Sequence, residues 1–189
     1  MKRAEFFQEF QMMADAYNTT SKEMFALYEK AASLTTETIR RGNKILICGN
    51  GGSCSTAAHI TNDFISHMLN WDRDGYPAIS LSDAGVITAV ANDYGFEKVF
   101  SRQVNALGKE DDLLWCFSTS GNSKNILMAV HEAKIKKMKT VGFTGKTGGD
   151  LKAHCDIWCP VNTDDLIKAE GIHLFLIHLL VMKLEEQIG

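Results

Sequence analysis

Proline is scarce in this sequence: only two occur among 189 residues, and there is no low-complexity tract or internal repeat. Nothing therefore indicates a linker, and the length fits a single domain over residues 1–189. Hydrophobic residues make up 45% and charged residues 23% of the chain, which is the balance of a globular protein with a buried core.

Positive charge and long hydrophobic runs are also lacking. Lysine and arginine total 20 against 23 acidic residues, and the net charge of -3 excludes the strongly basic surface of a nucleic-acid-binding protein. The longest apolar stretch, residues 171–182, contains two histidines and is shorter than the ~20 residues that span a bilayer. The N-terminus has no apolar signal-peptide core. We expect a soluble, cytoplasmic protein with no membrane or nucleic-acid partner.

The five cysteines do not indicate a disulfide framework, because their number is odd and the expected compartment is reducing. Cys48 and Cys116 lie in apolar runs, where a thiol acts as a small hydrophobic group. Cys155 and Cys159 lie beside His154, but no second ligand pair accompanies them. Packing is therefore a better interpretation than a zinc site here.

The first 42 residues predict two helices. Apolar residues recur at helical spacing over residues 6–14 and again over 24–39. The polar residues 18–21 offer a break and an N-cap for the second helix, and Gly42-Asn43 ends it.

Short apolar runs then alternate with helix-like segments. The runs lie at residues 44–48, 77–82, 112–118, 139–145 and 156–161. The helical segments lie at about 54–69, 84–91, 96–107, 122–136 and 147–154, and a last helix covers 164–187. This alternation predicts an α/β fold with three layers, in which helices cover both faces of a parallel five-stranded sheet.

The terminal helices carry more apolar surface than one sheet face needs. Packing between subunits would bury it, with residues 1–42 as an oligomerisation segment, whereas in a monomer the same helices would only cap the sheet. We favour the oligomer.

The first predicted strand runs into a glycine-rich turn, Gly49-Asn50-Gly51-Gly52-Ser53. A helix that begins here directs free N–H groups and a partial positive charge at the turn, which suits a phosphate. Neither nucleotide-binding motif matches, because Cys54 stands where a dinucleotide fingerprint needs glycine and Thr140 where a P-loop needs it.

The third predicted strand runs into a second candidate loop, Ser118-Thr119-Ser120-Gly121-Asn122-Ser123. Each hydroxyl can donate to a phosphate oxygen, and the next helix adds backbone N–H groups. The plainer alternative is a hydroxyl cluster that only caps that helix. Both loops follow the carboxyl ends of strands, where α/β proteins bind ligands, and we therefore favour the phosphate interpretation.

Two helices carry histidine with a carboxylate. His59 and Asp63 are four residues apart and share a helix face, although a helical histidine is more often structural. In the last helix Glu170 and His178 lie about 80° apart around the axis, so both can reach one pocket. Periodicity alone does not decide between His178 and His173.

These motifs resemble the sugar isomerase (SIS) domain and, within it, the phosphoheptose isomerase family. The resemblance rests on residues 48–53, 57–63, 91–104, 118–123, 142–149 and 172–178 and so covers nearly the whole chain. It implies a flavodoxin-like SIS fold and a homotetramer with active sites between subunits. It also implies the aldose–ketose isomerisation of sedoheptulose 7-phosphate to D-glycero-D-manno-heptose 7-phosphate, in the synthesis of lipopolysaccharide or related glycans.

The resemblance also assigns roles to single residues. The phosphate would be bound by Ser118, Thr119, Ser120 and Ser123. The sugar would be contacted by Asn50, Gly51, Gly52, Ser53 and Asp93. A zinc ion would be held by His59, Asp63, Glu170 and His178, the last three also being candidate catalytic residues.

The chain departs from the family pattern at two of these positions. Asp63 stands for a longer glutamate, and Glu170 for a neutral glutamine. Two carboxylates and two imidazoles suit a divalent metal well, but they leave open which carboxylate is the base. The counterpart of a family aspartate before the last helix is also open between Asp164 and Asp165.

Three other functions fit the same loops. The chain could be a non-enzymatic SIS-domain partner of a replication initiator protein, a sugar-phosphate sensor, or an isomerase of another ketose phosphate. The set of histidines and carboxylates favours an enzyme, since the first two functions do not need it.

Overall fold

The centre of the structure is a parallel sheet of five strands, which confirms the predicted fold class. The computed structural model describes residues 2–188, and its strands lie in the order β2-β1-β3-β4-β5. Their bounds are Ile45–Gly49 (β1), Ala78–Ser80 (β2), Leu113–Phe117 (β3), Lys139–Thr144 (β4) and Ile157–Pro160 (β5). The chain runs outward from β1 to β2 and then returns past β1 to β3, and ligands of α/β proteins bind at such a reversal.

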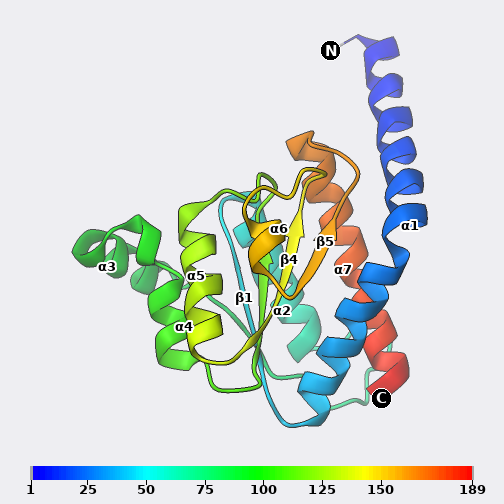
Figure 1. The fold of residues 1–189 in the computed structure, drawn as a ribbon. Coiled ribbons are helices and arrows are strands. Elements are labelled where there is room, and N and C mark those ends of the chain that lie inside the picture. Colours follow the sequence, from blue (N-terminus) through cyan, green and yellow to red (C-terminus); the bar gives the residue numbers. More distant parts are fainter. Residues whose placement is uncertain (1, 189) are drawn as a thin grey trace.

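Helices cover both faces of the sheet (Figure 1). One face packs against α1 (Arg3–Arg40), α2 (Gly52–Ile65) and α7 (Leu166–Ile188), and the other against α4 (Ser101–Leu107) and α5 (Lys124–Ile135). Alternate strand residues enter the two cores, as Ile45 and Ile47 do on the first face and Leu46 and Cys48 on the second. The strands are apolar at nearly every position because both faces are buried.

The N-terminal segment is one helix of 38 residues, and the prediction of two helices is wrong. The polar residues at the expected break satisfy their hydroxyl groups without interrupting the helix. Thr19 Oγ1 donates to the Asp15 carbonyl at 2.8 Å, and Ser21 Oγ donates to the Asn18 carbonyl at 3.0 Å. The first turns of α1 extend beyond the body of the molecule (Figure 1), and Phe6, Phe7 and Phe10 are exposed there.

Other segments also differ from their predicted bounds. The helix expected over 96–107 is divided into a short 3-10 turn, η1 (Phe96–Lys98), and α4. The helix expected over 147–154 is reduced to α6 (Leu151–His154), because Gly148 and Gly149 have φ angles of 77° and 49°, which a right-handed helix does not contain. The segment after β2 forms α3 (Ala84–Tyr94), which is longer than predicted and has no buried residue. Among residues 2–188 no helix is long and apolar enough to cross a membrane.

His173 joins α7 to the sheet. Its side chain is buried with 1% exposed, its Nε2 lies 3.1 Å from the Thr144 carbonyl, and its ring packs edge-on against Phe117 and Phe143. The carbonyl can only accept, so Nε2 carries the proton. Burial lowers the pKa of His173 from 6.5 to about 4, the hydrogen bond to Thr144 opposing this shift. The residue is therefore a neutral structural group.

Acidification is expected to destabilise the protein through His173. Between pH 6.5 and 4 the unfolded chain binds a proton here that the folded chain does not, so the free energy of unfolding falls as the pH falls. The full contribution is about 3 kcal/mol. Urea unfolding of the wild type and His173→Gln from pH 7 to 4.5 measures it, and the variant should show the shallower pH dependence. Parallel curves would contradict this account.

Candidate active site

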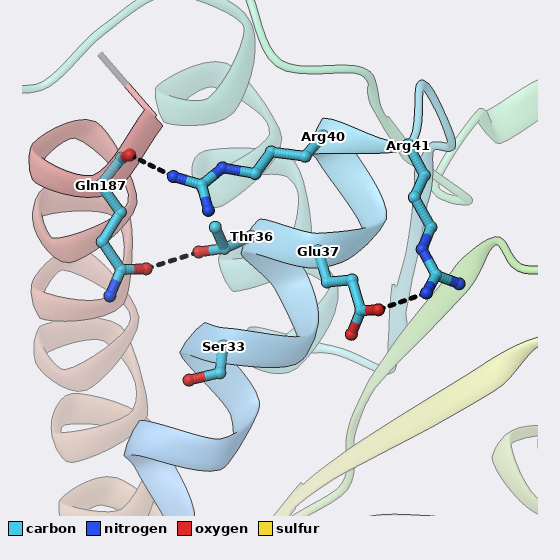
Figure 2. A pocket seen from close by; sticks show the side chains of 6 residues that line it. All are labelled: Ser33, Thr36, Glu37, Arg40, Arg41 and Gln187. Carbon is cyan, nitrogen blue, oxygen red and sulfur yellow. Dashed lines mark hydrogen bonds and ion pairs between the residues drawn. The ribbon is translucent and has the colours of Figure 1, made fainter.

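The part of the chain that the structure describes has several hollows, and two of them are compared as functional sites. The larger, about 550 Å³, lies between the C-terminal parts of α1 and α7 (Figure 2). Its polar groups are already engaged: Arg40 donates to the Gln187 carbonyl at 2.6 Å, Thr36 donates to the Gln187 side chain at 2.7 Å, and Arg41 pairs with Glu37. Nothing in it matches a predicted functional residue.

The second hollow, about 200 Å³, lies at the carboxyl ends of β1 and β3. It is lined by Asn50, Ser53, Phe117, Ser118, Thr119, Ser120, Ser123, Leu166 and Glu170. All but Phe117 and Leu166 were predicted from the sequence as site residues. Its position at the reversal of the sheet makes this hollow, the hydroxyl cavity, the better candidate despite its smaller size.

The glycine-rich turn forms one wall of the hydroxyl cavity. Gly51 has a φ of 55°, which other residues rarely adopt. At Gly52 a Cβ atom would lie 2.5 Å from both carboxylate oxygens of Glu170, so only glycine lets that carboxylate approach the start of α2. The glycines of this turn therefore provide a backbone conformation and a close approach that side chains would not allow.

The hydroxyl-rich loop forms the opposite wall. Ser118 Oγ donates to Ser123 Oγ at 3.3 Å, and Ser120 Oγ accepts from the Asn122 N–H at 3.2 Å. The Thr119 hydroxyl makes no hydrogen bond within residues 2–188 and is available to a ligand. Since Ser123 is the N-cap of α5 and its hydroxyl caps no backbone N–H, the start of this helix is also available.

A pair of amides joins the two loops. Asn50 Nδ2 donates to Asn125 Oδ1 at 2.9 Å, and Asn125 Nδ2 donates to Asn50 Oδ1 at 2.8 Å. Asn125 is buried, so it fixes the orientation of Asn50 at the cavity. The sequence did not predict this role, and a buried polar residue in the first turn of α5 was the only signal for it.

Three side chains meet where α2 packs against α7. Nε2 of His59 and Nε2 of His178 are 2.9 Å apart, and they lie 3.5 and 3.4 Å from Asp63 Oδ2. The ligand atoms of all three residues lie within 4.8 Å of one another. His59 and His178 are 119 positions apart in the chain, and the packing of α2 against α7 brings them together.

The chemistry of this His/Asp/His cluster fits a divalent metal ion. Asp63 Oδ2 is buried and has no hydrogen-bond partner within residues 2–188, which is costly for a carboxylate oxygen unless a cation or a ligand completes it. Imidazole nitrogens and a carboxylate oxygen are donors that zinc and similar ions prefer. The cluster does not specify which ion.

Comparisons with known proteins identify the family. The SIS domain profile matches residues 5–145. A phosphoheptose isomerase of Burkholderia pseudomallei is 45% identical over 168 residues, which cover 88% of this chain and 85% of that protein. The chain belongs to the phosphoheptose isomerase family. The structure of a phosphoheptose isomerase from Francisella tularensis aligns with a TM-score of 0.94 and 34% identity, covering 98% of this chain and 100% of the other. One from Neisseria gonorrhoeae aligns with a TM-score of 0.92 and 31% identity, covering 97% and 98%.

One residue that the family resemblance assigned to the metal lies elsewhere. Glu170 is outside the group formed by His59, Asp63 and His178 and lines the hydroxyl cavity against Gly52. Its carboxylate accepts no hydrogen bond within residues 2–188. In this chain three of the four expected ligands are together, and the fourth faces the place expected for the substrate.

Two further positions of the phosphoheptose isomerase pattern lie outside the cavity wall. Asp93 is on α3, is exposed, and pairs with Asn92 at 2.8 Å. Asp164 accepts from the N–H of Thr147, while Asp165 accepts from the N–H of Lys168 at 3.1 Å and so caps the start of α7. Neither Asp164 nor Asp165 lines the cavity.

Proposed function

We propose that this chain interconverts sedoheptulose 7-phosphate and D-glycero-D-manno-heptose 7-phosphate. The observation that carries the proposal is that α2 and α7 each contribute to both halves of the site. Ser53 and Glu170 line the hydroxyl cavity, while His59, Asp63 and His178 form the cluster further along the same helices. Six to eight residues of helix correspond to about 9 to 12 Å, which suits a substrate whose phosphate and carbonyl are several carbons apart.

Different residues of the chain bind the phosphate, the sugar and the metal ion. The hydroxyl-rich loop and the starts of α2 and α5 bind the phosphate, and Asn50, held by Asn125, orients the sugar. His59, Asp63 and His178 would hold the divalent ion, and we propose zinc. When bound, such an ion supplies Lewis-acid polarisation of the ketose carbonyl.

Proton transfer is assigned to Glu170. Isomerisation removes a proton from C1 of the ketose and returns it to C2, so one basic group must reach both carbons. Asp63 Oδ2 is directed at the two imidazoles, whereas the Glu170 carboxylate faces the cavity without a hydrogen-bond partner in the described chain. We therefore assign the base to Glu170, which would distinguish this chain from family members with glutamine at that position, while His59, Asp63 and His178 would hold the ion that polarises the oxygens at C1 and C2.

A homotetramer with sites between subunits, as in the family resemblance, is also part of the proposal. The exposed phenylalanines of α1, within residues 1–42, and the helix α3, which has no buried residue, would be covered by other copies. Asp93 on α3 would then reach the site of a neighbouring subunit. We place the enzyme in the cytoplasm, in heptose synthesis for lipopolysaccharide or related glycans.

Turnover of a panel of ketose phosphates tests the function. Sedoheptulose 7-phosphate should be converted fastest, by a species with the mass of four chains in light scattering. Thr119→Val removes one free hydroxyl from the cavity, and the KM should rise about tenfold, the loss of about one hydrogen bond to a charged group. Thr36→Val makes the same change in the larger hollow and should leave the KM unaltered. No turnover of any ketose phosphate, with capture of a replication initiator, would replace this function by the regulatory one.

A further inference from the structure

The segment between α2 and β2 encloses an ion pair that the site described above does not include. Arg73 Nε lies 2.8 Å from Glu185 Oε1, and each side chain is only 2% exposed. Burying two charges is expensive, and it stabilises a structure only when the remaining hydrogen-bonding groups of both are satisfied. The surroundings of this pair meet that condition.

Glu185 is surrounded by donors from the segment after α2. Its carboxylate accepts from the backbone N–H groups of Met68 at 2.7 Å, Leu69 at 2.7 Å and Asn70 at 3.1 Å, besides Arg73. Burial raises the pKa of Glu185, but these hydrogen bonds outweigh it and leave the pKa lowered. Glu185 therefore stays charged and fastens this segment to α7.

Arg73 completes the connection at the end of α2. Its Nη2 donates to the carbonyl of Asp63 at 2.7 Å, and its Nη1 donates to the carbonyl of Phe64 at 3.0 Å. These are among the last carbonyls of the helix, which have no partner inside it and which a positive charge favours. The guanidinium also lies 3.9 Å from the centre of the Tyr76 ring.

The connection joins the two helices that carry the metal-binding candidates. Asp63 is itself held through its backbone, while its Oδ2 has no hydrogen bond within residues 2–188. Glu185 lies seven residues after His178, two turns along the same face of α7. We propose that Arg73 and Glu185 are positioning residues that hold α2 against α7 at the register where His59, Asp63 and His178 meet. This inference rests on the proposed metal-dependent function.

Loss of the pair should weaken metal binding without abolishing the fold. Groups that orient metal ligands typically change metal affinity by about 10- to 100-fold when they are removed. Arg73→Lys keeps the charge, but its single nitrogen cannot occupy the three positions from which Nε, Nη1 and Nη2 donate to Glu185 and the two carbonyls. Glu185→Gln keeps the shape but loses the charge. The phosphate loops are at the other end of α2 and should be unaffected.

Titration of the metal-free protein with Co²⁺ tests the inference, since the visible absorption of Co²⁺ reports the geometry of its ligands. Both variants should bind Co²⁺ about 10- to 100-fold more weakly, with altered absorption, while the Kd of inorganic phosphate stays unchanged and shows that they are folded. Glu29→Gln is the matched control, because it breaks the Glu29–Lys183 pair between α1 and α7 without touching α2. It should leave the Co²⁺ spectrum and affinity unaltered.

The outcomes separate this inference from the function on which it rests. If Arg73→Lys and Glu185→Gln both keep the Co²⁺ spectrum and affinity of the wild type, the positioning role alone is overturned. A wild type that binds Co²⁺ no differently from His178→Ala would overturn the metal site and the positioning role together. Should Arg73→Lys fail to bind phosphate because it does not fold, Glu185→Gln, the more conservative change, decides the matter.

Discussion

His178→Ala is expected to lower kcat/KM for sedoheptulose 7-phosphate about 10³-fold and to remove most of the bound divalent metal. His178 contributes one of three ligand atoms that lie within 4.8 Å of one another, and alanine leaves only His59 and Asp63. Two ligands from one helix do not make a stable zinc site, and the polarisation of the carbonyl is lost with the metal. Steady-state kinetics and metal analysis of the purified variant measure both effects.

His131→Ala is the control for this experiment. His131 is exposed on α5, on the opposite side of the sheet from α2 and α7, and should be replaceable without effect on rate or metal content. Equal activity of His178→Ala and the wild type would show that the cluster takes no part in the reaction. The family assignment would survive that result, because it rests on the fold and on sequence identity.

The sheet and its covering helices could be predicted because burial on both faces leaves a clear pattern. Every strand coincides with a predicted apolar run, with β1 extending one residue beyond its run to Gly49, and the fold class, the family and the isomerase function are confirmed. The prediction failed where polar residues were taken as breaks. Thr19 and Ser21 interrupt the apolar pattern of α1 but not its backbone, because their hydroxyls bond to carbonyls of the same helix.

The site was predictable where it follows from the ends of strands. The two loops are adjacent because β1 and β3 are neighbours in the sheet. Their hydroxyl and glycine residues indicated a binding site at this edge, where the cavity lies. Helical spacing put His59 beside Asp63, but only the family resemblance selected His178 over His173. The connection from Arg73 to Glu185 was not predictable, since it joins residues 112 apart through a segment with no periodic pattern.

Glu170→Gln introduces the glutamine of the family pattern and should separate proton transfer from metal binding, because in this chain we assign the base to Glu170 and not to Asp63. An amide cannot take a proton from C1, so we expect kcat to fall about 10²- to 10⁴-fold, the usual contribution of a general base. The KM should not rise, because the change removes a negative charge from the cavity that binds the phosphate.

Metal content and isotope exchange decide which carboxylate is the base. With Glu170 outside the His/Asp/His cluster, Glu170→Gln should keep its metal, whereas Asp63→Asn should lose metal and activity together. In deuterated water, Glu170→Gln should also stop incorporating deuterium at C1 and C2 of the substrate, since an amide cannot take up the proton. If Glu170→Gln still incorporates deuterium but loses its metal, Glu170 is a metal ligand and Asp63 is the base. The carboxylate that faces the sugar, and not the one that faces the imidazoles, is the group that geometry favours for moving a proton between carbons.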